Sequence, residues 1–267
     1  MQANDQIDRA RLLAVATEAA AIAAAFIAEQ SSNRDNIEWQ SKSPTDFVSA
    51  VDIGAEQRIQ ECFRKHLPEL TVIGEELGPT GNTQSGLVAV VDPLDGTTNF
   101  LHGYPAYCVS ICVAVDGVAQ AACVHDVARG GVYTATLRGG AFVDGVPLKV
   151  SRISDPARAL IGTGFPFKDP AHIAPFQKQT AALMPVTSGL RRAGAAALDL
   201  ADVARGRFEG FWELELMPWD MAASTLLIRE AGGRVTRLDG SEATIGRGPL
   251  VASNGHLHDW LLEKLAL

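Results

Sequence analysis

Three short segments place acidic side chains where a folded chain can bring them together. Residues 74–76 read Gly-Glu-Glu after a strand-like run, residues 91–100 read Val-Asp-Pro-Leu-Asp-Gly-Thr-Thr-Asn-Phe after a buried strand, and residues 218–220 read Pro-Trp-Asp before a helix. Carboxylates at the ends of strands and the starts of helices can converge while they stay reachable. Because Mg²⁺ prefers oxygen ligands, the three segments together predict a site for hard divalent cations.

Each segment also has a simpler explanation when it is taken alone. Residues 92–96 make a good turn sequence, because Pro fixes φ and Gly accepts a positive φ. The pair 75–76 could be solvated, and Asp220 could simply cap its helix. The combination favours a metal site beside an anion site. The N–H groups of Gly96 and Thr97 would face a phosphate if a helix begins there, and the Thr97 hydroxyl could hold a water in line with phosphorus.

The chain as a whole is acidic, with 267 residues and a formal net charge of -8. Such a chain has no general attraction to nucleic acid or to an anionic membrane, although a local basic patch could still form. An anionic substrate therefore needs local positive charge, which bound cations would supply. The hydrophobic fraction of 47% suffices for one large domain or two packed smaller ones.

The cysteines indicate the cellular compartment. Cys62, Cys108, Cys112 and Cys123 form no Cys-x-x-Cys pair. Three of them lie in apolar, strand-like segments, which favours reduced, buried thiols in a cytoplasmic protein over zinc ligands or disulfides. The apolar run 12–26 is preceded by acidic residues and interrupted by a glutamate, unlike a signal peptide.

Hydrophobic periodicity predicts two kinds of organisation along the chain. In the first part we expect helices and then a strand and an antiparallel meander, over residues 12–26, 53–66, 87–91, 108–115, 118–125, 131–137 and 141–143. In the second part strands over 159–163, 210–214 and 250–253 alternate with helices over 176–183, 193–204, 221–230 and 256–265. We therefore expect an α+β half in residues 1–150 and an α/β half in residues 151–267.

The acidic segments resemble the signatures of the inositol monophosphatase family, within the lithium-sensitive, metal-dependent phosphatase superfamily. Gly-Glu-Glu, Asp-Pro-Leu-Asp-Gly-Thr-Thr-Asn-Phe and Trp-Asp-Met-Ala-Ala occur in the same order and at similar separations, and residues 42–52 resemble the N-terminal signature. Residues 97–100 are closer to the inositol branch than to the branch acting on phosphoadenosine phosphates. The resemblance implies a layered α-β-α-β-α sandwich. Its N-terminal α+β half would carry most metal ligands, and its C-terminal α/β half would complete the active site.

The resemblance also assigns metal ligands residue by residue. Glu75 and Asp92, with the carbonyl of Leu94, would bind a first Mg²⁺. Asp92, Asp95 and Asp220 would bind a second, and Glu75 would help to hold a third. Two cations about 3.5–4 Å apart can stabilise both the attacking and the leaving oxygen of an in-line displacement.

The family's water-activating pair matches Glu75 and Thr97, with Asp52 orienting the Thr97 hydroxyl. A metal-activated water needs no side-chain nucleophile. Lys42 resembles a lysine that contacts metal-bound water in the family, and an ordinary surface lysine is the alternative.

The alcohol side of the substrate involves a second set of residues. Beside the phosphate-facing Gly96 and Thr97, the family's hydroxyl-binding positions map onto Asp95, Gly194, Ala195, Ala196, Glu213 and Asp220. Carboxylates suit a polyol because they accept hydrogen bonds from hydroxyl groups. Glu213 could equally be an ordinary strand carboxylate.

The expected activity is Mg²⁺-dependent hydrolysis of an inositol monophosphate to inositol and phosphate, inhibited by Li⁺. The same carboxylates would serve histidinol phosphate or fructose 1,6-bisphosphate. The pair 191–192 (Arg-Arg) resembles a bacterial subgroup, one of whose members binds RNA polymerase in ribosomal RNA antitermination. The pair could also be simply solvated at the start of a helix. The resemblance further implies a homodimer.

Overall fold

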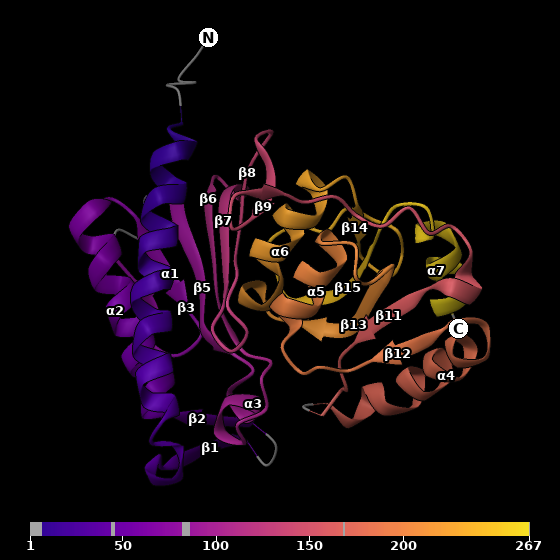
Figure 1. Ribbon diagram of the computed structural model, residues 1–267, viewed down its shortest axis with the longest axis horizontal. Helices are drawn as coiled ribbons and strands as arrows, with labels where there is room; N and C mark the ends of the chain where they lie inside the picture. The colour runs from indigo at the N-terminus through magenta and orange to yellow at the C-terminus, as the bar shows by residue number, and fades with distance from the viewer. Residues whose placement is uncertain (1–6, 44–45, 82–85, 168, 267) are drawn as a thin grey trace.

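The chain folds into five alternating layers of helix and sheet (Figure 1). The computed structural model describes residues 7–43, 46–81, 86–167 and 169–266. The helical layers are, in order through the molecule, the outer pair α1 (Arg9–Ser31) and α2 (Ala50–His66), the central pair α5 (Ala196–Ala204) and α6 (Pro218–Glu230), and the outer pair α4 (Ile173–Leu183) and α7 (His258–Leu265). This is the α-β-α-β-α sandwich expected from the sequence.

The first sheet lies between the first two helical layers and has the strand order β10-β9-β8-β7-β6-β5-β3-β4. Its strands are β3 (Thr71–Gly74), β4 (Gly78–Thr80), β5 (Leu87–Asp95), β6 (Cys108–Val115), β7 (Val118–Asp126), β8 (Val132–Thr136), β9 (Gly140–Val143) and β10 (Val146–Pro147). The predicted meander is confirmed: β6 to β9 pair antiparallel. Asp116 and Gly117 between β6 and β7 both have positive φ, as a tight hairpin turn requires.

The second sheet has the strand order β12-β11-β13-β15-β14. Its strands are β11 (Leu160–Thr163), β12 (Gly189–Arg191), β13 (Gly210–Leu216), β14 (Arg234–Thr236) and β15 (Gly248–Ser253). The remaining elements are the hairpin β1 (Trp39–Ser43) and β2 (Asp46–Ser49), the short helix α3 (Thr97–Leu101), and 3-10 turns at Arg34–Asn36, Pro156–Arg158, Pro170–His172 and Met184–Val186.

Helix α1 buries a stripe made mostly of alanines. Ala16, Ala19, Ala20 and Ala23 are fully buried, so the helix packs closely against α2, β6 and β7. By length and hydropathy alone α1 could cross a membrane, but this stripe makes it a core helix of the sandwich. Ile22 recurs with the apolar spacing of residues 12–26 but is 41% exposed, because the alanines form the centre of the stripe and Ile22 falls at its edge.

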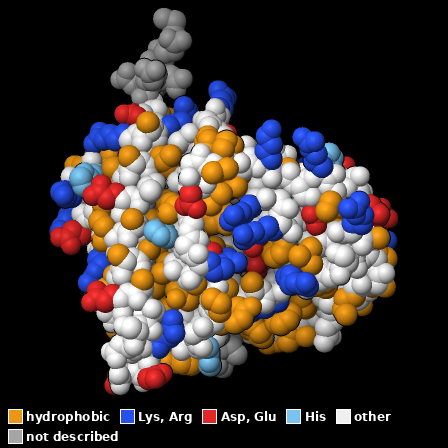
Figure 2. All heavy atoms as spheres, in the orientation of Figure 1, with side chains coloured by type: hydrophobic (Ala, Val, Ile, Leu, Met, Phe, Trp, Pro, Cys, Tyr) orange, Lys and Arg blue, Asp and Glu red, His pale blue; other side chains and the backbone are white. Residues whose placement is uncertain are grey.

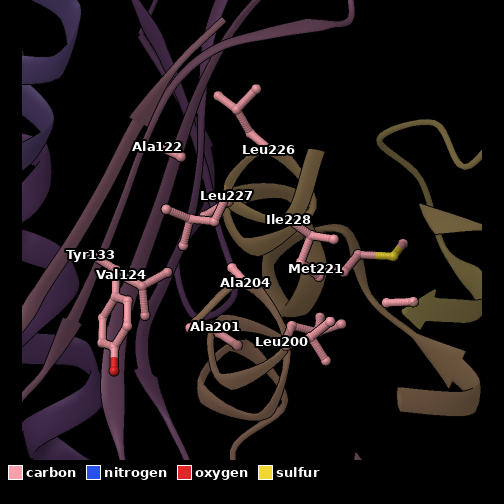
Figure 3. Packing of buried hydrophobic residues seen from close by; sticks show 14 of the residues in the cluster. Ala122, Val124, Tyr133, Leu200, Ala201, Ala204, Met221, Leu226, Leu227 and Ile228 are labelled. Atoms are coloured by element: carbon pink, nitrogen blue, oxygen red, sulfur yellow. The ribbon is translucent and has the colours of Figure 1, made fainter. Parts of the chain in front are cut away.

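The central helices join the two halves of the chain. Ala201 and Ala204 of α5 and Leu227 of α6 face Ala122 and Val124 of β7 (Figure 3). One buried cluster therefore contains residues from both sheets. The sheets fall on either side of residue 150, but the division into domains 1–150 and 151–267 stays a prediction.

A buried histidine ties α7 to the second sheet. Nδ1 of His258 lies 2.9 Å from Ser253 Oγ, and its Nε2 lies 2.9 Å from Thr236 Oγ1. Burial, aided by Arg234, lowers the pKa of His258 from 6.5 to about 4, while Asp259 acts in the opposite direction. His258 is therefore neutral in the folded protein at neutral pH.

We predict that His258 makes the protein less stable in mild acid. The unfolded chain binds a proton at this side chain below about pH 6.5, whereas the folded chain does so only near pH 4, so the free energy of unfolding falls as pH drops through that window. Urea denaturation between pH 4.5 and 7 should show a shallower decline for His258→Gln than for the wild type. Parallel declines for the two proteins would contradict the prediction.

Candidate active site

Strand β5 carries two buried carboxylates into one cavity. On a regular strand, residues three apart point to opposite faces of the sheet. The pairing of β5 with β6 is irregular between Asp92, which lies opposite Ser110, and Asp95, which lies opposite Cys108. This irregularity lets both carboxylates line the same cavity, where Asp92 and Asp95 are 2% and 8% exposed. Asp92 Oδ1 accepts a hydrogen bond of 3.0 Å from the backbone N–H of Leu94.

Parallel pairing of β3 with β5 brings Glu75 to the same place. Gly74 is aligned with Val91, and the N–H of Glu75 donates to the Val91 carbonyl at 3.2 Å. Because both strands end at this edge of the sheet, Glu75 joins Asp92 and Asp95 in lining the cavity.

Asp220 reaches the cavity from the first turn of α6. Its Oδ2 accepts a hydrogen bond of 2.7 Å from the N–H of Met217, the residue before the helix. Asp220 therefore does help to cap the helix, but from its third position, in a capping box with Met217, because Pro218 begins the helix.

The charges on these residues act on one another. Burial raises the pKa of Asp92 well above its usual value, and the negative charges of Glu75, Asp95 and Asp220 add to the effect. Burial also raises the pKa of Asp95 to about 7, opposed by the N–H of Ala197, which donates to its Oδ2 at 2.7 Å. An all-oxygen ligand set that is costly to ionise without a counter-charge fits a hard divalent cation such as Mg²⁺.

The hydroxyl of Thr97 is held in a fixed direction beside this cluster. Its Oγ1 lies 2.7 Å from Asp52 Oδ1 and 3.1 Å from the carbonyl of Leu94. The other carboxylate oxygen of Asp52 accepts from the backbone N–H and the hydroxyl of Ser49 at 2.8 and 2.7 Å, which caps helix α2. The buried carboxylate of Asp52 thus caps the start of α2 and also orients the Thr97 hydroxyl. Helix α3 begins at Thr97, after Gly96 in the left-handed region with φ of 90°.

A cavity of about 740 Å³ contains most of the expected site residues. Those that line it are Glu75, Asp92, Leu94, Asp95, Gly96, Thr97, Gly194, Ala196, Glu213 and Asp220. Asp52 and Ala195 are buried behind the lining, Asp52 against Thr97 and Ala195 beside Gly96. The side chain of Lys42 lies outside the described residues.

The far wall of the cavity belongs to the second sheet and α5. Glu213 on β13 lies against Gly164, where a Cβ would collide with its carboxylate. Burial raises the pKa of Glu213 well above its usual value, and Asp220, Asp199 and Asp95 raise it further.

Arg192 is exposed, as expected for a solvated residue, but it precedes the helix start and lies against two aromatic rings. Its guanidinium lies 5.3 and 5.1 Å from the ring centres of Phe165 and Phe167, and it lines the cavity. Helix α5 begins three residues later than expected, at Ala196, because Gly194 has a positive φ of 94° and Ala195 is extended.

The model of the inositol monophosphatase family matches residues 8–266. The chain belongs to the inositol monophosphatase family. A protein named Nus factor SuhB from Pseudomonas aeruginosa is 41% identical over 258 residues, covering 95% of each chain.

Solved structures agree with this family. The extragenic suppressor protein SuhB from Bartonella henselae has a TM-score of 0.91 at 35% identity, covering 95% of this chain and 98% of that one. The inositol monophosphatase from Anabaena has a TM-score of 0.82 at 35% identity, covering 96% of this chain and 95% of that one. The layered fold is shared.

Several residues around the site were not predicted from the sequence or from the family resemblance. Asp199, Phe165 and Phe167 line the cavity, and Glu56 supports it from behind. Asp199 could have been found from the sequence, because an acid between Leu198 and Leu200 in an apolar helical pattern is unusual. Nothing in the sequence marks Glu56, since a glutamate in a helix is most often solvated.

Glu56 of α2 holds the turn that carries Glu75. Glu56 is fully buried, and its Oε2 accepts from the N–H of Glu76 at 2.8 Å while its Oε1 accepts from the N–H of Leu77 at 3.2 Å. Gly74 is needed beside it, because a Cβ there would collide with the Glu56 carboxylate. The position of Glu75 therefore depends on a carboxylate from another element.

We predict that Glu56→Gln lowers the free energy of unfolding by about 1–3 kcal/mol, because the amide turns an NH₂ toward one of the two backbone N–H groups and leaves it unpaired. Glu61→Gln is the matched control, since Glu61 is an exposed residue of the same helix and its loss should cost under about 0.5 kcal/mol. Urea denaturation of both variants measures the difference. Equal stabilities would show that Glu56 does not support the turn.

Proposed function

We propose that the protein is a Mg²⁺-dependent phosphomonoesterase that hydrolyses inositol monophosphates to inositol and phosphate. One observation carries the proposal: Glu75, Asp92, Asp95 and Asp220 come from three remote segments to one cavity, beside the hydroxyl of Thr97. Membership of the inositol monophosphatase family supports phosphatase chemistry and metal binding.

The residues that would hold two to three Mg²⁺ ions are the carboxylates of Glu75, Asp92, Asp95 and Asp220 and the carbonyl of Leu94. When bound, the ions would neutralise charge on the phosphate and lower the pKa of a nearby water. The cluster is strongly negative without them, so an anionic ester would otherwise be repelled.

The chain's own groups would position and deprotonate the attacking water. When the Thr97 hydroxyl donates its proton to Asp52, its oxygen is left to accept a hydrogen bond from that water. Glu75 would take the water's proton as the water oxygen bonds to phosphorus and the ester P–O bond breaks. The departing alcohol oxygen gains a proton from solvent, and Gly96 and Thr97 would bind the phosphate from the start of α3.

The polar groups around the alcohol side of the cavity support a polyol as the leaving alcohol. Asp95, Glu213 and Asp220 offer carboxylate oxygens, and Gly194 and Ala196 offer backbone groups, all of which suit hydroxyl groups. Ala195 would support these two residues from behind the lining. Histidinol phosphate and fructose 1,6-bisphosphate would meet the same carboxylates, so they are alternative substrates that the experiment must separate.

We predict that the wild type releases phosphate from inositol 1-phosphate only with Mg²⁺, that Li⁺ inhibits it, and that Asp95→Asn lowers kcat by at least about a hundredfold. Asp95 is expected to ligate a cation, and its loss removes charge that no neighbour replaces. The measurement is phosphate release from a panel of inositol 1-phosphate, histidinol phosphate and fructose 1,6-bisphosphate.

Two controls accompany this panel. Circular dichroism should show an intact fold for Asp95→Asn. Mg²⁺ should raise Tm less in the variant than in the wild type, since ligands that bind only the folded state stabilise it. Near-normal turnover by Asp95→Asn would refute the site. A kcat/KM for inositol 1-phosphate well below that for another ester would reject inositol as the leaving alcohol.

A second candidate function is a contact with RNA polymerase in transcription. The relative from Pseudomonas aeruginosa, at 41% identity, is named a Nus factor. Although the chain is acidic, blue Lys and Arg side chains gather near the middle of the face shown in Figure 2. Co-purification of the protein with RNA polymerase at low salt tests the contact.

We also propose that the protein forms a homodimer and is cytoplasmic. A homodimer is consistent with exposed apolar side chains such as Phe167 and Met184. A cytoplasmic location is consistent with four buried cysteines that all have free thiols.

A further inference from the structure

Asp199 is a buried acid at the edge of the proposed site. It lies in the first turn of α5, is 2% exposed, and lines the cavity. Its place is fixed by two contacts of Ala197: the N–H of Ala197 donates to Asp95 at 2.7 Å, and its carbonyl accepts from the Ser224 hydroxyl of α6 at 2.7 Å. Asp199 therefore lies two residues along the helix from Ala197, whose N–H contacts Asp95 of the carboxylate cluster.

The carboxylate of Asp199 differs from other buried acids in its hydrogen bonding. Asp202, one turn further along α5, accepts from Arg207 at 2.8 Å, and Asp126 accepts from Arg129 at 2.7 Å. Glu209 accepts from the N–H of Leu160 at 2.7 Å. Within the described ranges of the chain, no group donates a hydrogen bond to the carboxylate of Asp199. Because Asp199 lines the cavity, a donor for its carboxylate can come only from a water or a ligand bound there.

The surroundings of Asp199 place it on the alcohol side of the cavity. Asp199 and Glu213 of β13 both line the cavity, and the charge of Asp199 raises the pKa of Glu213. The positive charge of Arg192 acts to lower the pKa of both Asp199 and Glu213. Asp199 thus shares the cavity with Glu213, where the leaving group would lie, and burial and then the charge of Asp95 raise its own pKa well above the usual value.

A ligand for Asp199 must bring a hydrogen-bond donor. An apolar leaving group would leave the carboxylate unpaired, and a second carboxylate or phosphate would be repelled by it. A hydroxyl donates to a carboxylate without adding charge. We propose that Asp199 is a specificity-determining residue that accepts a hydrogen bond from a hydroxyl of the leaving polyol; this proposal rests on the proposed function.

The test compares two esters in the variant Asp199→Ala. Inositol 1-phosphate has hydroxyls on its leaving group, and 4-nitrophenyl phosphate has none. The variant should lose about tenfold in kcat/KM on inositol 1-phosphate, mainly through a higher KM, because it loses one hydrogen bond to a charged group. On 4-nitrophenyl phosphate it should stay within about twofold of the wild type.

Asp202→Ala is the matched control. Asp202 lies on the same helix and is also buried, but its partner is Arg207. This variant should lower Tm and leave the ratio of the two kcat/KM values unchanged. A ratio that changes as much as in Asp199→Ala would make the effect structural and overturn the proposal.

Binding provides a readout that does not need turnover. Calorimetric titration with inositol in the presence of Mg²⁺ should show about tenfold weaker binding to Asp199→Ala, whereas inorganic phosphate should bind both proteins equally. If the wild type hydrolyses neither ester, the proposed function fails, and this titration still decides the role of Asp199.

Three outcomes would overturn the proposal for Asp199 while leaving a phosphatase intact. One is an equal loss on both esters, and another is no loss on either. The third is a loss confined to an amine-bearing ester such as histidinol phosphate, which would make an ammonium group, and no hydroxyl, the partner of Asp199.

Discussion

Repulsion among the buried carboxylates is the constraint on which this structure depends. Glu75, Asp92, Asp95 and Asp220 belong to three segments that would separate if their charges alone decided the fold. Backbone contacts hold three of them in place: Glu75 follows a strand paired with β5, Asp95 accepts from the N–H of Ala197, and Asp220 accepts from the N–H of Met217. The sandwich therefore opposes an unfavourable electrostatic energy, which is typical of a binding site for cations.

Contacts from several layers hold the carboxylates in place. The outer helix α2 reaches the site twice, through Asp52, which orients Thr97, and through Glu56, which holds the turn after Gly74. The central helix α5 reaches it from the other side through the N–H of Ala197. A rigid arrangement of acids thus results from contacts between layers, and no single segment carries it.

Local patterns in the sequence were enough to predict the meander and three converging acidic segments, because turns, periodicity and acidic spacing are local signals. The layered sandwich and the individual metal ligands were expected from the resemblance to the family. The irregular end of β5 was not predicted, since Pro93 marked those residues as a turn and only pairing with β6 extends the strand through Asp95. Glu56 and Asp199 were missed for a related reason. Burial of an acid depends on which elements pack over it, and that information is spread over the whole chain.

The central layer has a consequence for how the chain is made. Helices α5 and α6 cover the inner face of a sheet whose strands all precede residue 150. During synthesis, that sheet leaves the ribosome before the helices that bury it, so its apolar face, including Ala122 and Val124, stays uncovered until residue 230 has emerged. Nascent chains of this fold should therefore be clients of chaperones over that interval.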